Sequence, residues 1–312
     1  MRRPRLPSMF GLSLAATIGA TIGATVSAAI GAGLLGAPAQ ARVASPAPSA
    51  SVEARAELVC KTSVTGVDSE NRLVYYTVRN DLVIERRSSR PLGFRPTNLG
   101  YLGTDYTSTG STTRMTTTTA DGVPRELSVV ERDDSRTLRF SATTFGQKNY
   151  RPRLFTDAYS YFGYTINHVG VLQRWTLVRL RTGRLSYRYP VTVATNLKNT
   201  VAITPASLKS QPSADILYTT TKLGALRLLT VPHERPEDRS FRTLSARGYA
   251  GVTELSGSYC NGKDRGVVIG IDPTAGTATW TVVTDVSSPA RARSDLRGAI
   301  RRKVDWNLHA TL

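Results

Sequence analysis

Histidine is the side chain most often used as a general base, and this 312-residue sequence holds only three: His168, His233 and His309. Acids gather around one of them, in the group His233, Glu234, Glu237 and Asp238. Imidazole and carboxylate could hold a cation, but Pro232 and Pro236 predict a solvent-exposed turn instead. A second acidic loop, Asp68, Glu70 and Asn71, lacks the glycine that an EF-type calcium loop needs. We therefore expect no metal and no cofactor.

The common catalytic motifs are missing beyond residue 41: H-E-x-x-H, C-x-x-C, the P-loop and G-x-S-x-G. The stretch from Gly31 to Gly36 reads G-x-G-x-x-G. No strand pattern precedes it and no helix with a ribose-binding acid follows, so we do not interpret it as a dinucleotide site. A Ser-His-Asp arrangement is spatial and leaves no fixed spacing in a sequence. An enzyme therefore stays open as the alternative to a binding protein.

Positive charge is the strongest chemical bias, because 41 Lys and Arg face 23 Asp and Glu, a net charge of +18. The densest basic run is Arg291, Arg293, Arg297, Arg301, Arg302 and Lys303. Leu296, Ile300 and Val304 follow at four-residue spacing, which predicts a short helix. We expect Arg301, Arg302 and Lys303 to contact an anionic polymer. The alternative is a solvated segment that packs Val304 and Trp306 onto the fold.

The first 41 residues have the layout of a secretory signal peptide. Three arginines lie in Met1–Arg5, residues 9–36 carry no charge, and Ala39-Gln40-Ala41 is a small-x-small cleavage site. Removing this leader leaves 38 basic and 23 acidic residues, a net charge of +15. Residues 42–57, rich in Ala, Ser, Pro and Val, predict a flexible spacer. We expect a secreted protein; a leader retained as a membrane anchor at the cell surface is the alternative.

The remaining residues, 58–312, predict a single all-β domain. Apolar residues make up 40% of the sequence, which argues against disorder, and two cysteines argue against a disulfide-dense mini-protein. Short runs rich in Val, Thr, Tyr, Leu and Ile are paired around turn residues, as in β-hairpins. Five such hairpins are centred on Asn80, Asp134, Gly183, Gly224 and Gly276.

The hairpin centres are separated by 54, 49, 41 and 52 residues. An aromatic and glycine-rich segment recurs between them: Gly100–Thr104, Gly248–Thr253 and, more weakly, Ser160–Thr165. Repeats of 40 to 50 residues with about four strands each are typical of propeller blades. The sequence therefore predicts a β-propeller of five four-stranded blades; two β-sandwich domains are the alternative.

Cys60 and Cys260 stand in segments that enter the first and the last of these repeats. The first and last blades of a closed ring are neighbours, so a bond between the two is geometrically possible. An even pair of cysteines in a secreted chain is most simply a disulfide. In the chain-entropy model, tying about 200 residues into one loop stabilises by ~4–5 kcal/mol.

Five repeats of this length, in an exported chain with hairpins such as Asn71-Arg72-Leu73-Val74-Tyr75-Tyr76, resemble the tachylectin-like five-bladed propeller lectins. The resemblance covers about residues 58–312 and is one of architecture and repeat period. It implies binding rather than catalysis. The Trp-rich, Gly-Gly sugar signature of that family is absent, because Trp175, Trp280 and Trp306 do not recur blade by blade.

These observations together predict a secreted, non-catalytic binding module that recognises an extracellular or cell-surface anionic polymer or glycan. The alternative is an extracellular hydrolase or lyase with its site in the propeller channel. The sequence carries no dedicated nucleic-acid motif, and it predicts membrane contact only if the leader is retained. It gives no signal for an oligomeric state.

Overall fold

The computed structural model describes residues 60–145, 151–158, 162–183, 185–206, 213–260, 264–300 and 304–312. They lie in one compact unit, Ala54–Leu312. Within these ranges every regular element is a β-strand except a short 3-10 helix, η1 (Pro236–Asp238). The all-β prediction is confirmed. Across the same ranges we find no helix with the length and apolar character to span a bilayer. The predicted signal peptide and spacer lie outside the described residues.

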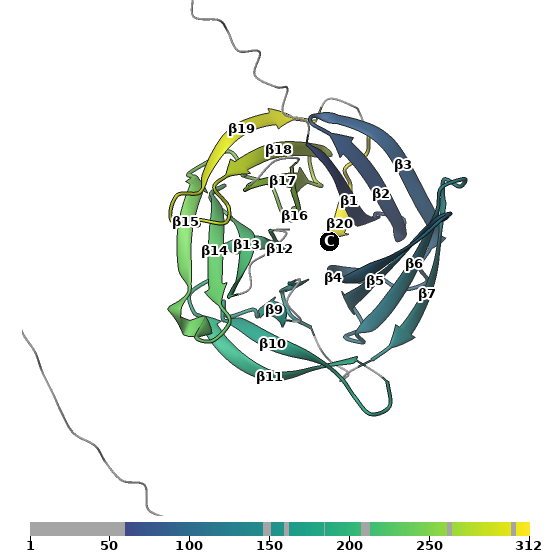
Figure 1. Cartoon of the computed structure of the whole chain (residues 1–312), viewed down its shortest axis with the longest axis horizontal. Coiled ribbons are helices and arrows are strands. Elements are labelled where there is room, and N and C mark those ends of the chain that lie inside the picture. Colours follow the sequence, from purple (N-terminus) through teal and green to yellow (C-terminus); the bar gives the residue numbers. More distant parts are fainter. Residues whose placement is uncertain are drawn as a thin grey trace, which may run out of the picture. The chain divides into compact units, whose positions relative to one another are not determined.

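The strands form three antiparallel sheets of four and one sheet of eight, in which two outer strands pair in parallel at Ser88–Thr137 and Ser89–Leu138. Divided at this parallel pairing, the strands make five antiparallel groups of four, each ordered below from its innermost to its outermost strand (Figure 1). Group 1 is β20 (Leu308–Thr311), β1 (Lys61–Asp68), β2 (Arg72–Arg79) and β3 (Leu82–Pro91). Group 2 is β4 (Pro96–Thr107), β5 (Gly110–Thr119), β6 (Arg125–Arg132) and β7 (Thr137–Thr144). Group 3 is β8 (Leu154–Asp157), β9 (Phe162–Ile166), β10 (Leu172–Arg179) and β11 (Leu185–Ala194). Group 4 is β12 (Thr200–Pro205), β13 (Ala214–Thr221), β14 (Leu226–Pro232) and β15 (Ser240–Ser245). Group 5 is β16 (Glu254–Tyr259), β17 (Arg265–Asp272), β18 (Thr277–Thr284) and β19 (Arg293–Ala299).

The innermost strands follow one another around a common centre (Figure 1). β4 contacts β8, β8 contacts β12, β12 contacts β16, and β16 contacts both β20 and β1. The circle closes where β20 meets β4. This closed arrangement of radiating antiparallel sheets is a β-propeller.

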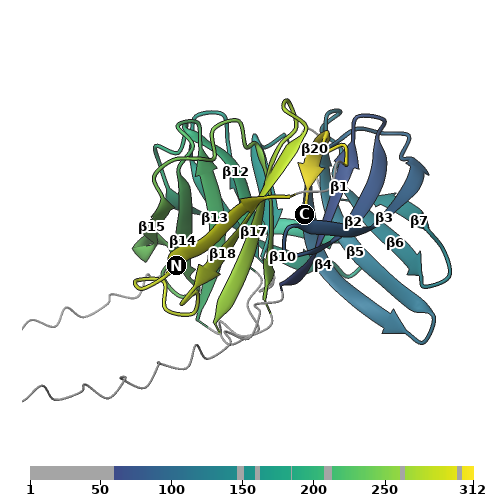
Figure 2. The ribbon, with the colours of Figure 1, turned by 90° about the horizontal axis from the view of Figure 1, so that it is seen from above.

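Group 1 combines strands from distant parts of the sequence. β20 pairs with β1 through Gly66–Thr311 and Val67–Ala310, and Figure 2 shows the two strands side by side. β20 is short, and its pairs with β1 begin only at Gly66. The first half of β1 therefore faces the centre of the propeller directly.

Buried apolar side chains fill four of the five interfaces between neighbouring groups. Separate clusters join groups 1 and 5, groups 4 and 5, groups 3 and 4, and groups 1 and 2. Their large members come from alternate strand positions, which point to one face of a sheet; Tyr76, Tyr218 and Leu127 are examples. Among the described residues, no such cluster joins groups 2 and 3. That interface is built differently.

All five predicted hairpins are present, but they are not equivalent. In groups 1 to 3 they join the two outer strands, whereas in groups 4 and 5 they join the two middle strands. This change of position explains the short spacing of 41 residues between Gly183 and Gly224. The equivalent turn, between the two middle strands, centres on Asn71, Gly122, Gly170, Gly224 and Gly276. All five residues have a positive φ, between 58° and 85°.

Two further expectations are wrong. The aromatic and glycine-rich segments do not repeat in equivalent places: Gly100–Thr104 lies in innermost β4, whereas Gly248–Thr253 precedes β16 and Phe162–Thr165 lies in second strand β9. The predicted helix near Leu296 is instead strand β19, paired with β18. Its backbone partners in an existing sheet outweigh the weak four-residue periodicity, and Gly298 lowers helix propensity.

The predicted disulfide is confirmed. Cys60 and Cys260 are bonded, with their Cα atoms 4.5 Å apart. Cys60 directly precedes β1, and Cys260 directly follows β16. The bond therefore links group 1 to group 5 across the closure of the circle.

Candidate functional site

Two cavities share part of their walls. The central cavity, of about 260 Å³, is lined by residues of all five groups. The side cavity, of about 390 Å³, lies between groups 2 and 3, the interface without an apolar cluster. Asp157 and Tyr101 line both cavities.

Hydroxyl groups dominate the wall of the central cavity. The innermost strands of groups 2 to 5 contribute Thr104, Thr156, Thr204, Ser256 and Ser258, and β1 contributes Ser63 and Thr65. Ser63 lies in the part of β1 that β20 does not cover. Because β20 is too short to cover this part of β1, Ser63 can line the cavity.

Asp157 is the one acidic side chain that the described residues place on either cavity wall. It is the last residue of β8 and is 2% exposed. The Tyr187 hydroxyl lies 2.8 Å from its Oδ1, and the Thr116 hydroxyl donates to Oδ2. Thr116 belongs to group 2 and Tyr187 to group 3, so the carboxyl lies where the two groups meet.

Two glycines make space for this carboxyl. A Cβ on Gly163 would lie 2.9 Å from Asp157 Oδ1 and 2.7 Å from Tyr187 Cε1. A Cβ on Gly100 would collide with Oδ2 of Asp157 and come within 2.7 Å of the Thr116 hydroxyl. Any side chain at either position would displace the hydrogen-bonded group.

Burial controls the ionisation of Asp157. It raises the pKa of the carboxyl from 3.8 to about 7, while the hydrogen bonds from Thr116 and Tyr187 act in the opposite direction. A carboxyl with this pKa exchanges a proton near neutral pH. That makes Asp157 the candidate acid or base of the site.

The side cavity combines an apolar wall with two cations. Its apolar side chains are Leu102, Ala158, Phe162, Leu177 and Leu185. Arg114 and Arg179 provide the charge. The Nε atom of Arg114 is buried and lies 3.8 Å from Asp105, beyond hydrogen-bonding distance. Arg179 donates to the carbonyl of Gly183, which holds its guanidinium near the cavity. This wall suits an anionic ligand with an apolar face.

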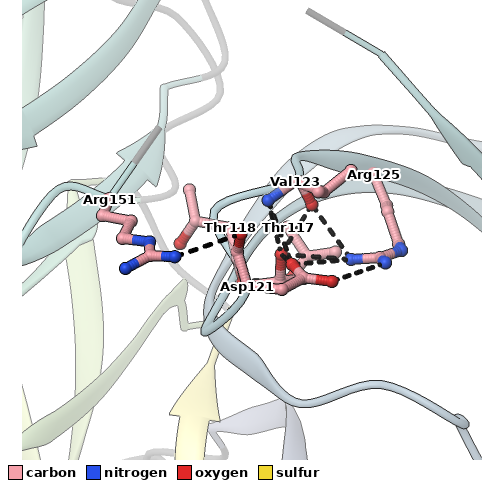
Figure 3. Close-up of polar contacts among 7 residues, drawn as sticks. Thr117, Thr118, Asp121, Val123, Arg125 and Arg151 are labelled. Atoms are coloured by element: carbon pink, nitrogen blue, oxygen red, sulfur yellow. Dashed lines mark hydrogen bonds and ion pairs between the residues drawn. The ribbon is translucent and has the colours of Figure 1, made fainter. Parts of the chain in front are cut away.

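Polar contacts link groups 2 and 3 at other points of their interface. The backbone N–H of Phe155 donates to Asn98 of group 2, at 3.0 Å. At the turn after β5, Asp121 pairs with Arg125, and Arg151, which precedes β8, donates to the Asp121 carbonyl (Figure 3). The Arg125 guanidinium holds the pKa of Asp121 well below its usual range.

The acids and histidines singled out from the sequence have other partners. His233 lies 3.3 Å from buried Asp215, whose second oxygen accepts a hydrogen bond from Tyr164. Asp238 pairs with Arg235. In the calcium-loop candidate, Asp68 and Glu70 both pair with Arg72. Across the described ranges no group of three or more His, Cys, Asp or Glu side chains is placed to bind a metal.

The candidate polymer contacts, Arg301, Arg302 and Lys303, lie outside the described residues. The sequence did not reveal the two cavities, although Gly100–Thr104, which it singled out as a repeated segment, contributes to both walls. Thr116 belongs to a Ser/Thr-rich stretch, but neither Asp157 nor Tyr187 carries a local motif. Their relationship is created by the packing of group 2 against group 3.

Comparisons with known proteins leave the family open. No protein-family model and no curated protein matches this chain. The solved structures that resemble it, at low similarity, include the following two. A crystal structure of BBS1N in complex with ARL6DN has a TM-score of 0.32 and 14% identity, over 69% of this chain and 63% of that one. Prolyl oligopeptidase B from Galerina marginata has a TM-score of 0.33 and 11% identity, over 76% of this chain and 32% of that one. At these values neither neighbour bears on the function.

Proposed function

We propose that this protein is a secreted, non-catalytic binding module that recognises an anionic polymer or acidic glycan. Its five strand groups are then the five blades of a tachylectin-like propeller. The observation that carries the proposal is the side cavity, where Arg114 and Arg179 flank an apolar wall. The net charge of +15 expected after removal of the leader would attract such a ligand from solution.

The composition of the walls favours binding over triad hydrolysis. Among the described residues, the two cavities bring together one acid, two tyrosines, two arginines and no histidine. Arginine pairs with carboxylate, phosphate and sulfate oxygens in a bidentate way, which gives both affinity and orientation. Because no described residue on these walls is a histidine, a serine there has no histidine to activate it as a nucleophile.

The test is binding of polygalacturonate and of wall teichoic acid, measured by calorimetry at ~50 and ~200 mM salt. We expect R114Q/R179Q to weaken binding at least tenfold. The matched control is Arg265→Gln, which removes an exposed arginine from β17 in group 5. Equal losses in the two variants would show that general charge, and not the side cavity, binds the polymer. Absence of binding at low salt would refute the proposed function.

A second function, an extracellular hydrolase or lyase, rests on Asp157 alone. An acid with a pKa of about 7 that faces both cavities could donate a proton to a leaving oxygen. Incubating the bound polymer with the protein and measuring new reducing ends or unsaturated products would reveal it. Activity abolished by Asp157→Asn would support the enzyme; products absent over long incubation would leave binding as the function.

Secretion remains part of the proposal and has its own test. The disulfide is compatible with an extracellular protein. Intact-mass analysis of secreted material should give a chain that begins at Arg42. An uncleaved chain in the membrane fraction would instead support the retained anchor.

A further inference from the structure

Two large aliphatic side chains are exposed at one end of groups 3 and 4. Leu223, in the turn between β13 and β14, is 83% exposed, and Val169, in the turn between β9 and β10, is 62% exposed. Each directly precedes the positive-φ glycine of its turn. Groups 1 and 2 have Glu70 and Asp121 at the same position, so the turn does not require an aliphatic residue. One exposed leucine is ordinary on a protein surface, and its surroundings decide what it means.

Backbone hydrogen bonds join the two turns through the link between β11 and β12. In this link the N–H of Leu197 donates to the carbonyl of Gly170, at 2.8 Å. Two residues later the carbonyl of Asn199 accepts from the N–H of Lys222, also at 2.8 Å. Gly170 and Lys222 are the sequence neighbours of the two exposed aliphatic residues. The aliphatic side chains therefore belong to one continuous, hydrogen-bonded surface.

The charge around these turns is positive. In an antiparallel group of four strands, the middle turn and the link to the next group lie at the same end. The link between β15 and β16 joins this surface, because Tyr249 donates to the carbonyl of Gly224. Lys198, Lys222 and Arg247 are exposed on these loops. No Asp or Glu occurs in the described turns and links at this end of groups 3 and 4, which are residues 151–153, 167–171, 195–199, 222–225 and 246–253.

An anionic lipid surface uses both the aliphatic side chains and the cations. Aliphatic side chains on a turn can enter the boundary between headgroups and acyl chains, while neighbouring lysines and arginines contact the lipid phosphates. A water-soluble anionic polymer would use the cations and leave the aliphatic side chains in water. In a symmetric contact between two copies of the chain, the cations of one surface would face those of the other.

We propose that this end of groups 3 and 4 docks on a bilayer that contains anionic lipids. Val169 and Leu223 enter the membrane, and Lys198, Lys222 and Arg247 contact lipid phosphates. Docking of this kind places the folded domain on the membrane surface and does not require the predicted leader to be retained. It does not rest on the proposed recognition of an anionic polymer, since the arginines of the side cavity take no part in it.

The first experiment is co-sedimentation of the chain that begins at Arg42 with vesicles of phosphatidylglycerol and phosphatidylcholine. Vesicles of phosphatidylcholine alone should bind at least tenfold more weakly, because they lack the net negative charge. V169S/L223S should weaken binding to the mixed vesicles at least tenfold, although it leaves the net charge unchanged. The control Tyr189→Ser removes a 73% exposed aromatic side chain from β11 and should bind as wild type does. Unchanged binding of V169S/L223S, or no binding of wild type, would overturn the proposal.

The lysines are tested with a charge-matched control. K198Q/K222Q should weaken binding to the mixed vesicles at least fivefold. R239Q/R265Q removes two exposed arginines from the opposite end of groups 4 and 5, where Arg239 precedes β15 and Arg265 begins β17. Its loss of affinity should be much smaller. Equal losses in the two variants would show that overall charge causes the adsorption, which would overturn the proposal.

Insertion is measured with Leu223→Trp and lipids that carry bromine in their acyl chains. We expect these lipids to quench more fluorescence in this variant than in wild type. The control Tyr189→Trp should show no additional quenching. Absence of additional quenching in Leu223→Trp would overturn the proposal, because the side chain would then remain outside the membrane.

Two further measurements separate this surface from other partners. An oligomer that V169S/L223S converts into a monomer in the absence of vesicles would overturn the proposal and identify a contact between copies of the chain. V169S/L223S should bind polygalacturonate as wild type does, and R114Q/R179Q should keep its binding to vesicles. The failure of the membrane surface is therefore distinguishable from the failure of the proposed polymer site.

Discussion

Tyr187 reaches across the whole of group 3 to place its hydroxyl 2.8 Å from Asp157 Oδ1, although Tyr187 lies on outermost β11 and Asp157 on innermost β8. The tyrosine ring passes directly over Gly163 on β9. Phe145 and Phe155 pack around the same ring, with centroids 5.8 and 5.5 Å away. The bond fixes the position of the carboxyl that faces both cavities.

The ionisation of Asp157 predicts a pH-dependent stability. Between about pH 4 and about pH 7 the unfolded chain releases this proton while the folded chain keeps it, so stability falls as the pH rises. The difference between 3.8 and about 7 corresponds to about 4 kcal/mol. Glu254, whose pKa burial raises to about 8, acts in the same direction.

Asp157→Asn isolates the contribution of this one carboxyl. We expect urea unfolding to show the variant gaining stability over wild type at pH 8 relative to pH 5, by about 2.5 kcal/mol, because part of the full effect has already been lost by pH 5. Glu254 is unchanged in both proteins and cancels in the comparison. An equal difference at the two pH values would contradict the raised pKa.

Gly163→Ala should destabilise the protein by about 1–3 kcal/mol, because the new Cβ meets the Tyr187 ring at 2.7 Å within a packed interface. The measurement is the urea midpoint. Tyr187→Phe is the companion variant: it keeps the ring and removes the hydroxyl, so it reports the hydrogen bond alone. A midpoint of Gly163→Ala within error of wild type would mean that the ring moves freely.

Breaking the Cys60–Cys260 bond should lower the free energy of unfolding by about 2–5 kcal/mol, since the bond closes a loop with a sequence separation of 200. Cys60→Ser/Cys260→Ser and reduced wild type should behave alike in guanidinium unfolding. Two titratable thiols in the denatured, unreduced protein would show that the bond does not form in the purified protein.

The basic run predicts a steep salt dependence. If several arginines contact a polyanion, affinity should fall by orders of magnitude between ~50 and ~200 mM salt, because each contact releases a counterion. Replacing Arg301, Arg302 and Lys303 by Gln should make the plot of log affinity against log salt shallower. Should the slope stay unchanged, these three residues do not contact the polymer, and the side-cavity arginines become the candidates.

The sequence allowed the all-β class, the hairpins and the disulfide to be predicted because each has a local or pairwise signal. Turn residues such as Asn80 and Gly276 identify the strands next to them, and two cysteines allow only one pairing within the chain. Equivalence between repeats was harder, since outer and middle hairpins have the same composition. Positive φ does not separate them either, since the outer-hairpin residues Asn80 and Gly183 share it with Asn71 and its glycine counterparts; only the pairing of the strands does.

The cavities could not be predicted for a different reason. Thr116, Asp157 and Tyr187 are 41 and 30 residues apart in sequence, and only the contact between groups 2 and 3 unites them. Gly100 and Gly163 resemble ordinary strand glycines until the carboxyl that they accommodate is seen.

The pairing of β20 with β1 has a consequence for biosynthesis. The strand partner of Gly66 is Thr311, which is synthesised 245 residues later. Group 1 therefore stays incomplete while the other groups are translated. Until then β1 exposes an unpaired edge, the kind of surface that recruits strands from other chains. Cys60 can bond to Cys260 only after β16 has emerged, and that covalent link would then hold β1 near its final position while the closing strand arrives.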